Sequence, residues 1–445
     1  MLIQYKSLQL AQPNNYVCSM NKHKQTRIAM MRKVLLAVGI AVGMLVIVTQ
    51  ADAQEKNVFM YGKVTTISGD SYTGPIRWGS DEVYWMETFN AQKTSNDFLR
   101  FLSKKEAETI SNESEGKSWM GINLRSLNIW EDKFSRINHQ FDTQFGDIKS
   151  IEPTGRERAR LTLKNGVILE VNGSGYEDVG ATIRVYDEEL GEIKLKWSRI
   201  EKVEFMEPAS MPSHSFGTPI FARVDAGRKG VFEGLIQWDK DERFMEEILD
   251  GKDRDGDKQI PFRSISKIAK GRSGSEVTLH SGRQLTLTGT NDVNSQNSGI
   301  VVNAPGLGQI TIPWRDFEEM EILKTGSGLA YSDFPVSQGL SATIVTINGD
   351  EHNGLIAFDL DEAWEFEILD AKDDNVEFKI PMRNIKNIIP KNSDYSTVVL
   401  RDGTDLLLGD HRDVSESNSG VLIFTSKDSE PIYVRWSRID EIIFD

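Results

Sequence analysis

The sequence predicts an all-β protein built from three tandem repeats. Apolar and polar residues alternate with a period of two along most of the chain, and Gly or Asn/Asp turn residues recur about every 8 to 12 residues. Residues 354–369 (GLIAFDLDEAWEFEIL) also have close relatives at 234–249 (GLIQWDKDERFMEEIL) and at 74–89 (GPIRWGSDEVYWMETF). Recurrence of one pattern along a chain is typical of copies of one supersecondary unit.

Residues 1–53 are expected to be a leader that ends in a secretory signal peptide, with its core at about residues 31–53. A basic pair at 32–33 precedes the apolar run 34–49, and Ala-Asp-Ala at 51–53 fits the cleavage site of such a signal. An uncleaved membrane anchor is the alternative, because the run is near the lower limit for crossing a bilayer. We therefore expect an exported protein, periplasmic or extracellular, with membrane association only through an uncleaved signal segment.

Charge and cysteine content exclude several classes. The chain has 52 basic and 67 acidic residues, a net charge of −15, so its surface repels phosphate backbones and nucleic acid is not an expected partner. The only cysteine, Cys18, lies in the predicted leader. Disulfides and thiolate metal sites are therefore not expected after cleavage, and the sequence predicts no cofactor.

Each repeat is predicted to contain two related units of about five strands each. Hairpin signals stand at corresponding places in the second unit of each repeat, at 164–166 (KNG), 280–282 (HSG) and 401–403 (RDG). The expected repeats are residues 54–206, 217–323 and 329–445, separated by a Pro- and Ser-rich stretch at 207–217 and a Gly-rich stretch at 324–329. The order of strands and the placement of glycines resemble small SH3-like or Sm-like barrels. This resemblance implies a pair of five-stranded barrels in each repeat and carries no functional residue.

The first repeat differs from the others by an insertion at about residues 92–140. Residues 95–110 have the N-cap and apolar spacing of an amphipathic helix, and residues 119–130 return to strand-like alternation. Repeat proteins often carry their function on such insertions. Trp119 and Trp130 lie here outside the repeated pattern, so both a core position and a partner or glycan contact stay open for them.

The candidate catalytic and metal-binding residues are better explained by structural roles. An Asp-Glu pair recurs in each repeat (Asp81-Glu82, Asp241-Glu242, Asp361-Glu362), and we interpret it as a solvated acidic turn, with paired catalytic carboxylates as the alternative. The DRDGD run at 253–257 lacks the spacing of an EF-hand and is expected to be an acidic hairpin tip. Three tryptophans at matching places are expected in the core. They are Trp197, Trp314 and Trp436.

The sequence contains no H-E-x-x-H, G-x-S-x-G, G-x-G-x-x-G or G-x-x-x-x-G-K motif, and its histidines lack metal-ligand spacing. We therefore expect no catalytic residue and a non-enzymatic binding or scaffold protein of the cell envelope, whose partner is an envelope protein or glycan. The alternative is an envelope glycan-binding module, or a glycan hydrolase that uses the carboxylates of one repeat.

Overall fold

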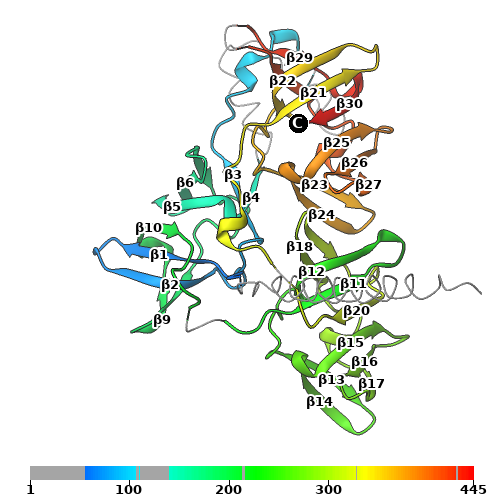
Figure 1. Cartoon of the computed structure of the whole chain (residues 1–445). Helices are drawn as coiled ribbons and strands as arrows, with labels where there is room; N and C mark the ends of the chain where they lie inside the picture. Colours follow the sequence, from blue (N-terminus) through cyan, green and yellow to red (C-terminus); the bar gives the residue numbers. More distant parts are fainter. Residues whose placement is uncertain (1–55, 107–109, 111–139, 213–215, 327, 427–428) are drawn as a thin grey trace, which may run out of the picture. The chain divides into compact units, whose positions relative to one another are not determined.

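The protein is all-β with large antiparallel sheets (Figure 1). The computed structural model describes residues 56–106, 110, 140–212, 216–326, 328–426 and 429–445, which lie in one compact unit, Lys56–Asp445. In this part of the chain no helix has the length and apolar character needed to cross a membrane. The predicted signal peptide lies outside the described residues.

The first segment, residues 56–206, holds one ten-stranded sheet. Its strands are β1 (Tyr61–Thr66), β2 (Ser71–Trp78), β3 (Thr88–Lys93), β4 (Gln140–Gln144), β5 (Ile148–Gly155), β6 (Arg158–Leu163), β7 (Ile168–Asn172), β8 (Ile183–Asp187), β9 (Gly191–Leu195) and β10 (Ile200–Phe205). Their order across the sheet is β4-β3-β7-β6-β5-β10-β1-β2-β8-β9.

The second segment, residues 217–323, has ten strands in an equivalent order. They are β11 (Phe221–Asp225), β12 (Val231–Gln237), β13 (Ile248–Asp253), β14 (Gly256–Pro261), β15 (Ile265–Lys270), β16 (Ser275–Leu279), β17 (Gln284–Leu287), β18 (Ile300–Ala304), β19 (Gly308–Ile312) and β20 (Glu319–Ile322). The pairings run β17-β16-β15-β20-β11-β12-β18-β19. The hairpin of β13 and β14 meets the residue after β17 through a single bridge, Lys252 to Thr288.

The third segment, residues 329–445, repeats this order. Its strands are β21 (Ser341–Thr346), β22 (Glu351–Phe358), β23 (Ile368–Asp373), β24 (Val376–Pro381), β25 (Ile385–Pro390), β26 (Tyr395–Leu400), β27 (Asp405–Gly409), β28 (Val421–Phe424), β29 (Ile432–Val434) and β30 (Ile439–Phe444). Here the order is β24-β23-β27-β26-β25-β30-β21-β22-β28-β29.

Short 3-10 turns connect many of these strands. They are η1 (Leu99–Phe101), η2 (Phe145–Asp147), η3 (Trp197–Arg199), η4 (Gly227–Lys229), η5 (Phe262–Ser264), η6 (Asn291–Val293), η7 (Tyr331–Asp333), η8 (Met382–Asn384), η9 (Arg412–Val414) and η10 (Trp436–Arg438). Several precede a strand that begins with isoleucine, as η2 does before β5 and η10 before β30.

The expected pairs of separate five-stranded barrels are not found, because the sheets are large and do not close. The two halves of each segment instead interleave: β2 of the first half pairs with β8 of the second, and β3 pairs with β7. Local sequence patterns define strands and hairpins, whereas pairing between distant strands depends on how the halves pack. The two predicted units therefore share one sheet in the first and third segments, whereas β13 and β14 of the second segment form a separate two-stranded sheet.

The core consists of two large apolar clusters. One joins the second and third segments, and the other fills the first segment with contributions from Leu235, Phe244, Phe334 and Phe366. The three tryptophans that the sequence assigned to the core, Trp197, Trp314 and Trp436, are buried at 5%, 8% and 5% exposure.

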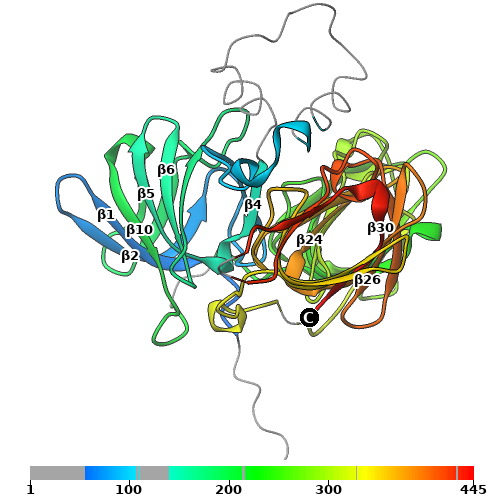
Figure 2. The ribbon, with the colours of Figure 1, turned by 90° about the horizontal axis from the view of Figure 1, so that it is seen from above.

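The views from two directions agree on the neighbours of the first segment. Strand β4 lies next to the third segment in Figures 1 and 2, and Thr143 in β4 bridges to Glu367 beside β23.

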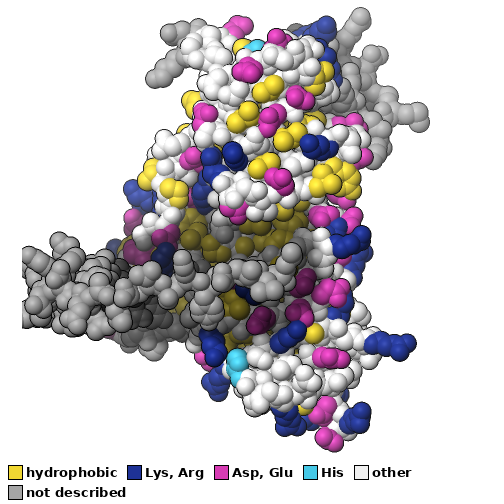
Figure 3. All heavy atoms as spheres, turned by 45° about the vertical axis from the view of Figure 1, so that its right-hand side comes forward, with side chains coloured by type: hydrophobic (Ala, Val, Ile, Leu, Met, Phe, Trp, Pro, Cys, Tyr) yellow, Lys and Arg dark blue, Asp and Glu magenta, His cyan; other side chains and the backbone are white. Residues whose placement is uncertain are grey.

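Figure 3 shows basic side chains scattered among acidic ones, with hydrophobic side chains gathered in a hollow near the middle of that view. The negative charge is thus spread over this face and does not form one continuous patch.

Candidate functional site

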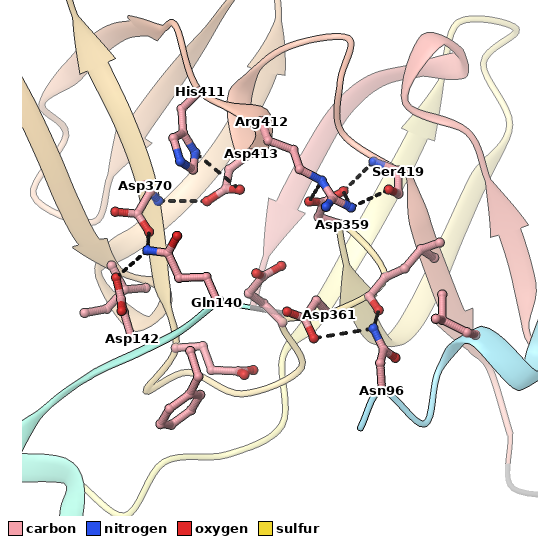
Figure 4. Close-up of a pocket in the computed structure, with 16 residues that line it drawn as sticks. Asn96, Gln140, Asp142, Asp359, Asp361, Asp370, His411, Arg412, Asp413 and Ser419 are labelled. Atoms are coloured by element: carbon pink, nitrogen blue, oxygen red, sulfur yellow. Dashed lines mark hydrogen bonds and ion pairs between the residues drawn. The ribbon is translucent and has the colours of Figure 1, made fainter. Parts of the chain in front are cut away.

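A cavity of about 170 Å³ lies between the first and third segments (Figure 4). Seven of its lining side chains are carboxyl groups. The lining residues are Asn96, Leu99, Gln140, Phe141, Asp142, Asp359, Leu360, Asp361, Glu362, Glu367, Ile368, Asp370, His411, Arg412, Asp413 and Ser419.

Five stretches of the chain bring these side chains together. The third segment supplies the turn after β22, the start of β23 and the loop from η9 to β28, and the first segment supplies β4 and the residues near η1. The turn after β22 is tight, since Asp359 and Leu360 have positive φ of 48° and 60°. Phe358 and Glu362 exchange backbone hydrogen bonds of 2.7 and 3.0 Å across it, which directs the Asp361 and Glu362 side chains toward the cavity.

Two of the carboxylates have structural roles that recur in every segment. Glu367 accepts hydrogen bonds from the backbone N–H groups of Ala363 and Trp364, at 2.6 and 3.0 Å. Glu87 and Glu247 make the same pair of bonds in the other segments. These carboxylates cap backbone donors that would otherwise be buried without a partner.

Asp413 is the second structural carboxylate. It accepts a 2.8 Å hydrogen bond from the backbone N–H of Asp370. Asp178 and Asp292 accept the equivalent bonds, at 2.7 Å each, from Asn90 and Asp250. Glu367 and Asp413 therefore belong to the common fold, as does the recurring Asp361-Glu362 pair, whereas Gln140, Asp142 and His411 distinguish this one place.

Cations of the first and third segments face this acidic wall. The Lys93 ammonium lies 2.5 Å from Glu367 Oε1 and 3.1 Å from Asp361 Oδ1, and the Lys93 side chain is only 10% exposed. Lys379 lies 2.7 Å from Asp142, and Arg412 lies 2.6 Å from Asp359. The seven carboxyl groups outnumber these cations, so the cavity favours positive charge at pH values where most of the carboxyl groups are ionised.

Burial shifts the pKa values of several lining groups. It raises the pKa of Asp359 to about 7 even though Arg412 acts in the opposite direction, and it raises the pKa of Asp370 to about 7 against the effect of Lys379. Burial and the neighbouring Asp361 raise the pKa of Glu362 well above its usual range. These acids hold protons at neutral pH more strongly than exposed acids do.

His411 adds a titratable cation to the same wall. Burial lowers its pKa, but the carboxylates of Asp413 and Asp370 raise it by more, so the net pKa lies above the ordinary histidine value. In Figure 4 the imidazole lies beside Asp413 and above Asp370. Protonation of His411 and of the nearby acids would therefore change the charge of the cavity around neutral pH.

Some polar atoms of the wall have no hydrogen-bond partner in the described part of the chain. Among them are the buried atoms Glu362 Oε2 and Asp142 Oδ1. Gln140 donates to both Asp142 and Asp370, at 2.8 and 3.2 Å, and thereby links the two segments across the cavity. Asp142 Oδ1 is therefore an acceptor without a donor in a partly open cavity, and it suits a ligand that donates a hydrogen bond.

The Asp-Glu pairs are turns, as expected, but they are not all solvated, because each glutamate is half-buried and Asp361 is buried. The backbone of each glutamate closes a bridge to the last aromatic residue before the turn, for example Glu82 to Trp78. Burial raises the pKa of Glu82 to about 9 and that of Glu242 to about 10. The tight turn holds the glutamate backbone beside that aromatic residue, which a count of charged residues in sequence does not reveal.

The other predicted site residues have different outcomes. Trp119 and Trp130 lie outside the described residues. The DRDGD run forms the tip of the β13–β14 hairpin, as the sequence predicted, and Asp253 pairs with Lys258 at 2.6 Å. Phe98, Leu99, Leu102 and Ile110 of the expected amphipathic helix pack against a small apolar cluster of the third segment that includes Ala357 and Leu422. The described part of this stretch forms η1 and is helical at residues 104–106 and at 110.

Sequence reasoning missed the η9 residues and the β4 residues of the cavity. His411, Arg412 and Asp413 follow one another, which was the available signal, but nothing local connects them with Gln140 or Asp142. No group of His, Cys, Asp and Glu side chains in the described ranges could hold a metal ion. Comparisons with protein-family models, with curated proteins and with solved structures found no match to this chain.

Proposed function

We propose that this is an exported, non-enzymatic binding or scaffold protein of the cell envelope, made of three tandem copies of one interleaved unit. The equivalent strand orders of the three segments support the tandem copies. The hydrogen-bonding glutamates Glu87, Glu247 and Glu367 support them as well. The export assignment is based on the predicted signal peptide at about residues 31–53.

The cavity between the first and third segments is the proposed ligand site, and its ligand class is an organic cation that donates hydrogen bonds. The observation that supports this ligand class is the excess of carboxyl groups around a space with an unpartnered acceptor, Asp142 Oδ1. An interaction of this kind exists within the protein, because the Lys93 ammonium binds the carboxylates of Asp361 and Glu367 next to the cavity. A lysine side chain or terminal amine of a partner fits this pattern.

Calorimetric titration with n-butylammonium, which has the shape of a lysine side chain, tests this site. We expect binding that strengthens as pH rises through about 7, because Asp359 and Asp370 then become negatively charged. Asp370→Asn should weaken binding about tenfold, the loss of roughly one charge-assisted hydrogen bond. Asp257→Asn, at an exposed acid outside the cavity, is the matched control and should bind as the wild type does.

Equal binding by wild type and Asp370→Asn, or binding that weakens as pH rises, would contradict the proposed site. Retained binding of a neutral alcohol of the same length would show that shape alone recognises the ligand.

The inserted region is proposed as a second binding region, in which Trp119 and Trp130 contact an envelope partner. A pull-down from solubilised envelope compares the chain with a deletion of residues 95–138. Loss of the same partners on deletion is the expected outcome, and their retention would remove the insertion from the proposal.

A glycan hydrolase is the second candidate function. The observation that favours it is the presence of two acids with pKa of about 7, Asp359 and Asp370, at one cavity, since glycoside hydrolysis uses a carboxylic acid that can give up a proton near neutral pH. Release of reducing ends from envelope glycans, abolished by both Asp359→Asn and Asp370→Asn, would favour this function over binding alone.

A further inference from the structure

The second and third segments are joined by direct pairing of two sheet edges. Strand β19 pairs antiparallel with β24, with Gln309 opposite Lys379, Ile310 opposite Phe378 and Thr311 opposite Glu377. This pairing makes one continuous 18-stranded sheet. It shows how the outer edge of one such segment accepts the outer edge of another.

The equivalent edges of the first and second segments are unpaired in the described part of the chain. Strand β9 holds the place of β19 and pairs there only with β8, and β14 holds the place of β24 and pairs only with β13. Strand β14 also keeps the Ile-Pro ending of β24, at residues 260–261 and 380–381. Open edges with main-chain donors and acceptors are templates for pairing with another strand.

The first of two local features marks β9 as an edge of the same type as β19. Gly308 opens β19, and a Cβ there would come within 2.1 Å of the Lys379 carbonyl oxygen, so glycine permits the close approach. Gly191 opens β9 in the same place, and a Cβ there would meet no atom within 4 Å. Its positive φ of 74° also suits the β8–β9 turn. The space beside Gly191 is therefore open where the space beside Gly308 is filled by a strand.

The second feature is an exposed leucine. Leu307, just before β19, packs against the apolar core that the second and third segments share. Leu190, just before β9, is 64% exposed. An apolar side chain that is covered at the paired edge and uncovered at the open one is expected if the open edge has a partner.

Charge on the strands does not exclude this pairing. Strand β24 carries Glu377 and Lys379 and still pairs with β19. If β9 met β14 in the same register, Lys194 would take the place of Thr311 and Asp257 the place of Glu377, so opposite charges would face each other. Strand β29 fits less well, since Pro431 stands where Gln309 does and has no N–H to donate.

We propose that β9 of one copy of this chain pairs antiparallel with β14 of a second copy, in the register of β19 with β24. Lys194 then lies opposite Asp257 of the other copy, and Leu190 becomes covered. Two such contacts made reciprocally close a dimer, and contacts made in one direction only build a linear chain. In this proposal, each open edge is paired with a strand from a second copy of the chain.

Sedimentation velocity of the purified full chain over a range of concentrations tests the proposal. We expect reversible association that Leu190→Ser weakens about tenfold, because a covered leucine is replaced by a polar residue. Leu407→Ser, at a leucine that is 56% exposed on β27, is the matched control and should associate as the wild type does. Both side chains are exposed, so neither change disturbs the core of the single chain.

A charge exchange tests the register. Lys194→Glu and Asp257→Lys should each weaken association about threefold to fivefold, and the double variant should recover it. Asp257→Lys also removes an exposed pair with Lys252, which contributes little to folding.

A zero-length crosslinker on mixed light and heavy isotope-labelled chains gives the direct readout, a Lys194–Asp257 crosslink that joins a light chain to a heavy one. A chain that stays monomeric at every concentration, a double variant without recovery, or a crosslink found only within one chain would overturn the proposal.

Discussion

The third segment is joined to its two neighbours in different ways. It meets the second segment through backbone pairing of β19 with β24. It meets the first segment mainly through side chains: Lys93 with Glu367, Arg383 with Asp147, and Lys379 with Asp142, beside the single bridge of Thr143 to Glu367. One junction therefore depends on the shape of two strand edges, and the other depends on the identity and charge of individual residues.

This difference explains where the candidate site lies. Strand pairing fills the space between two edges with main-chain hydrogen bonds, as at Gly308, and leaves no room for a ligand. Ion pairs hold the first segment at the third while leaving a cavity lined by charged groups between them. Ion-pair geometry also makes that junction sensitive to pH and to single substitutions.

The largest effect is expected from breaking the buried ion pair of the first junction. Arg383 contacts both oxygens of Asp147, at 2.7 and 2.9 Å, and the Asp147 side chain is 2% exposed. Arg383→Met leaves that carboxylate without its cation and should lower the free energy of unfolding by about 3–5 kcal/mol, measured by urea denaturation.

The matched control for Arg383→Met is Arg263→Met. Arg263 holds the same place in the second segment, is exposed and makes no ion pair within the described ranges. A change of less than about 0.5 kcal/mol is expected there. Equal losses at the two positions would show that the side-chain junction does not depend on its ion pairs.

A smaller effect is expected at the strand-paired junction. Gly308→Ala places a Cβ against the backbone of β24 at a positive φ of 137°, and should cost about 2 kcal/mol in urea denaturation. Gly191→Ala meets open space and should cost only the roughly 1 kcal/mol of left-handed backbone strain when measured on dilute protein. A larger loss at Gly191 than at Gly308 would contradict the role of close strand approach.

The two junctions should also differ in their response to pH. The folded-state pKa of Asp370 is about 7, above its ordinary value of 3.8, so the folded protein binds more protons than the unfolded chain between these values. The contribution of Asp370 to stability therefore falls as pH rises from about 4 to about 7. Asp370→Asn should flatten this part of the stability profile, while Gly308→Ala should lower stability by the same amount at each pH. If the stability-versus-pH profile of Asp370→Asn ran parallel to that of the wild type, the assigned pKa shift would be contradicted.

The smallest effect concerns an exposed ion pair between the first and third segments. Lys56 lies 2.9 Å from Asp333 of η7, with side chains 47% and 28% exposed. Lys56→Ala should change the unfolding free energy by about 0.5 kcal/mol or less, and added salt should remove the difference. A loss comparable to that of Arg383→Met would show that exposure does not rank the ion pairs of this protein.

The sequence predicted the local structure well and the pairing between distant strands poorly. The hairpin turns at Asn165-Gly166 and Asp402-Gly403 lie between β6 and β7 and between β26 and β27, because Asx-Gly turns encode their own geometry. The prediction of separate barrels was wrong because β2 with β8, and β3 with β7, are chosen by packing across more than one hairpin.

The candidate site shows the same division. Asp361 and Glu362 were recognised in sequence as part of a recurring acidic turn, but their solvation was wrongly predicted: Asp361 is buried and Glu362 is half-buried, and burial raises the pKa of Glu362. Gln140 and Asp142 reach the cavity from a strand more than two hundred residues away, as the hydrogen bond of Gln140 to Asp370 shows.

The sequence by itself determined the all-β class, the positions of the turns and the buried tryptophans, because alternation, Asx-Gly turns and recurring aromatics act over a few residues. Only the tertiary structure decided the interleaving of each segment, the two kinds of junction and the charge of the cavity. These depend on which distant edges and side chains meet, and on how far burial then shifts the acids that face one another.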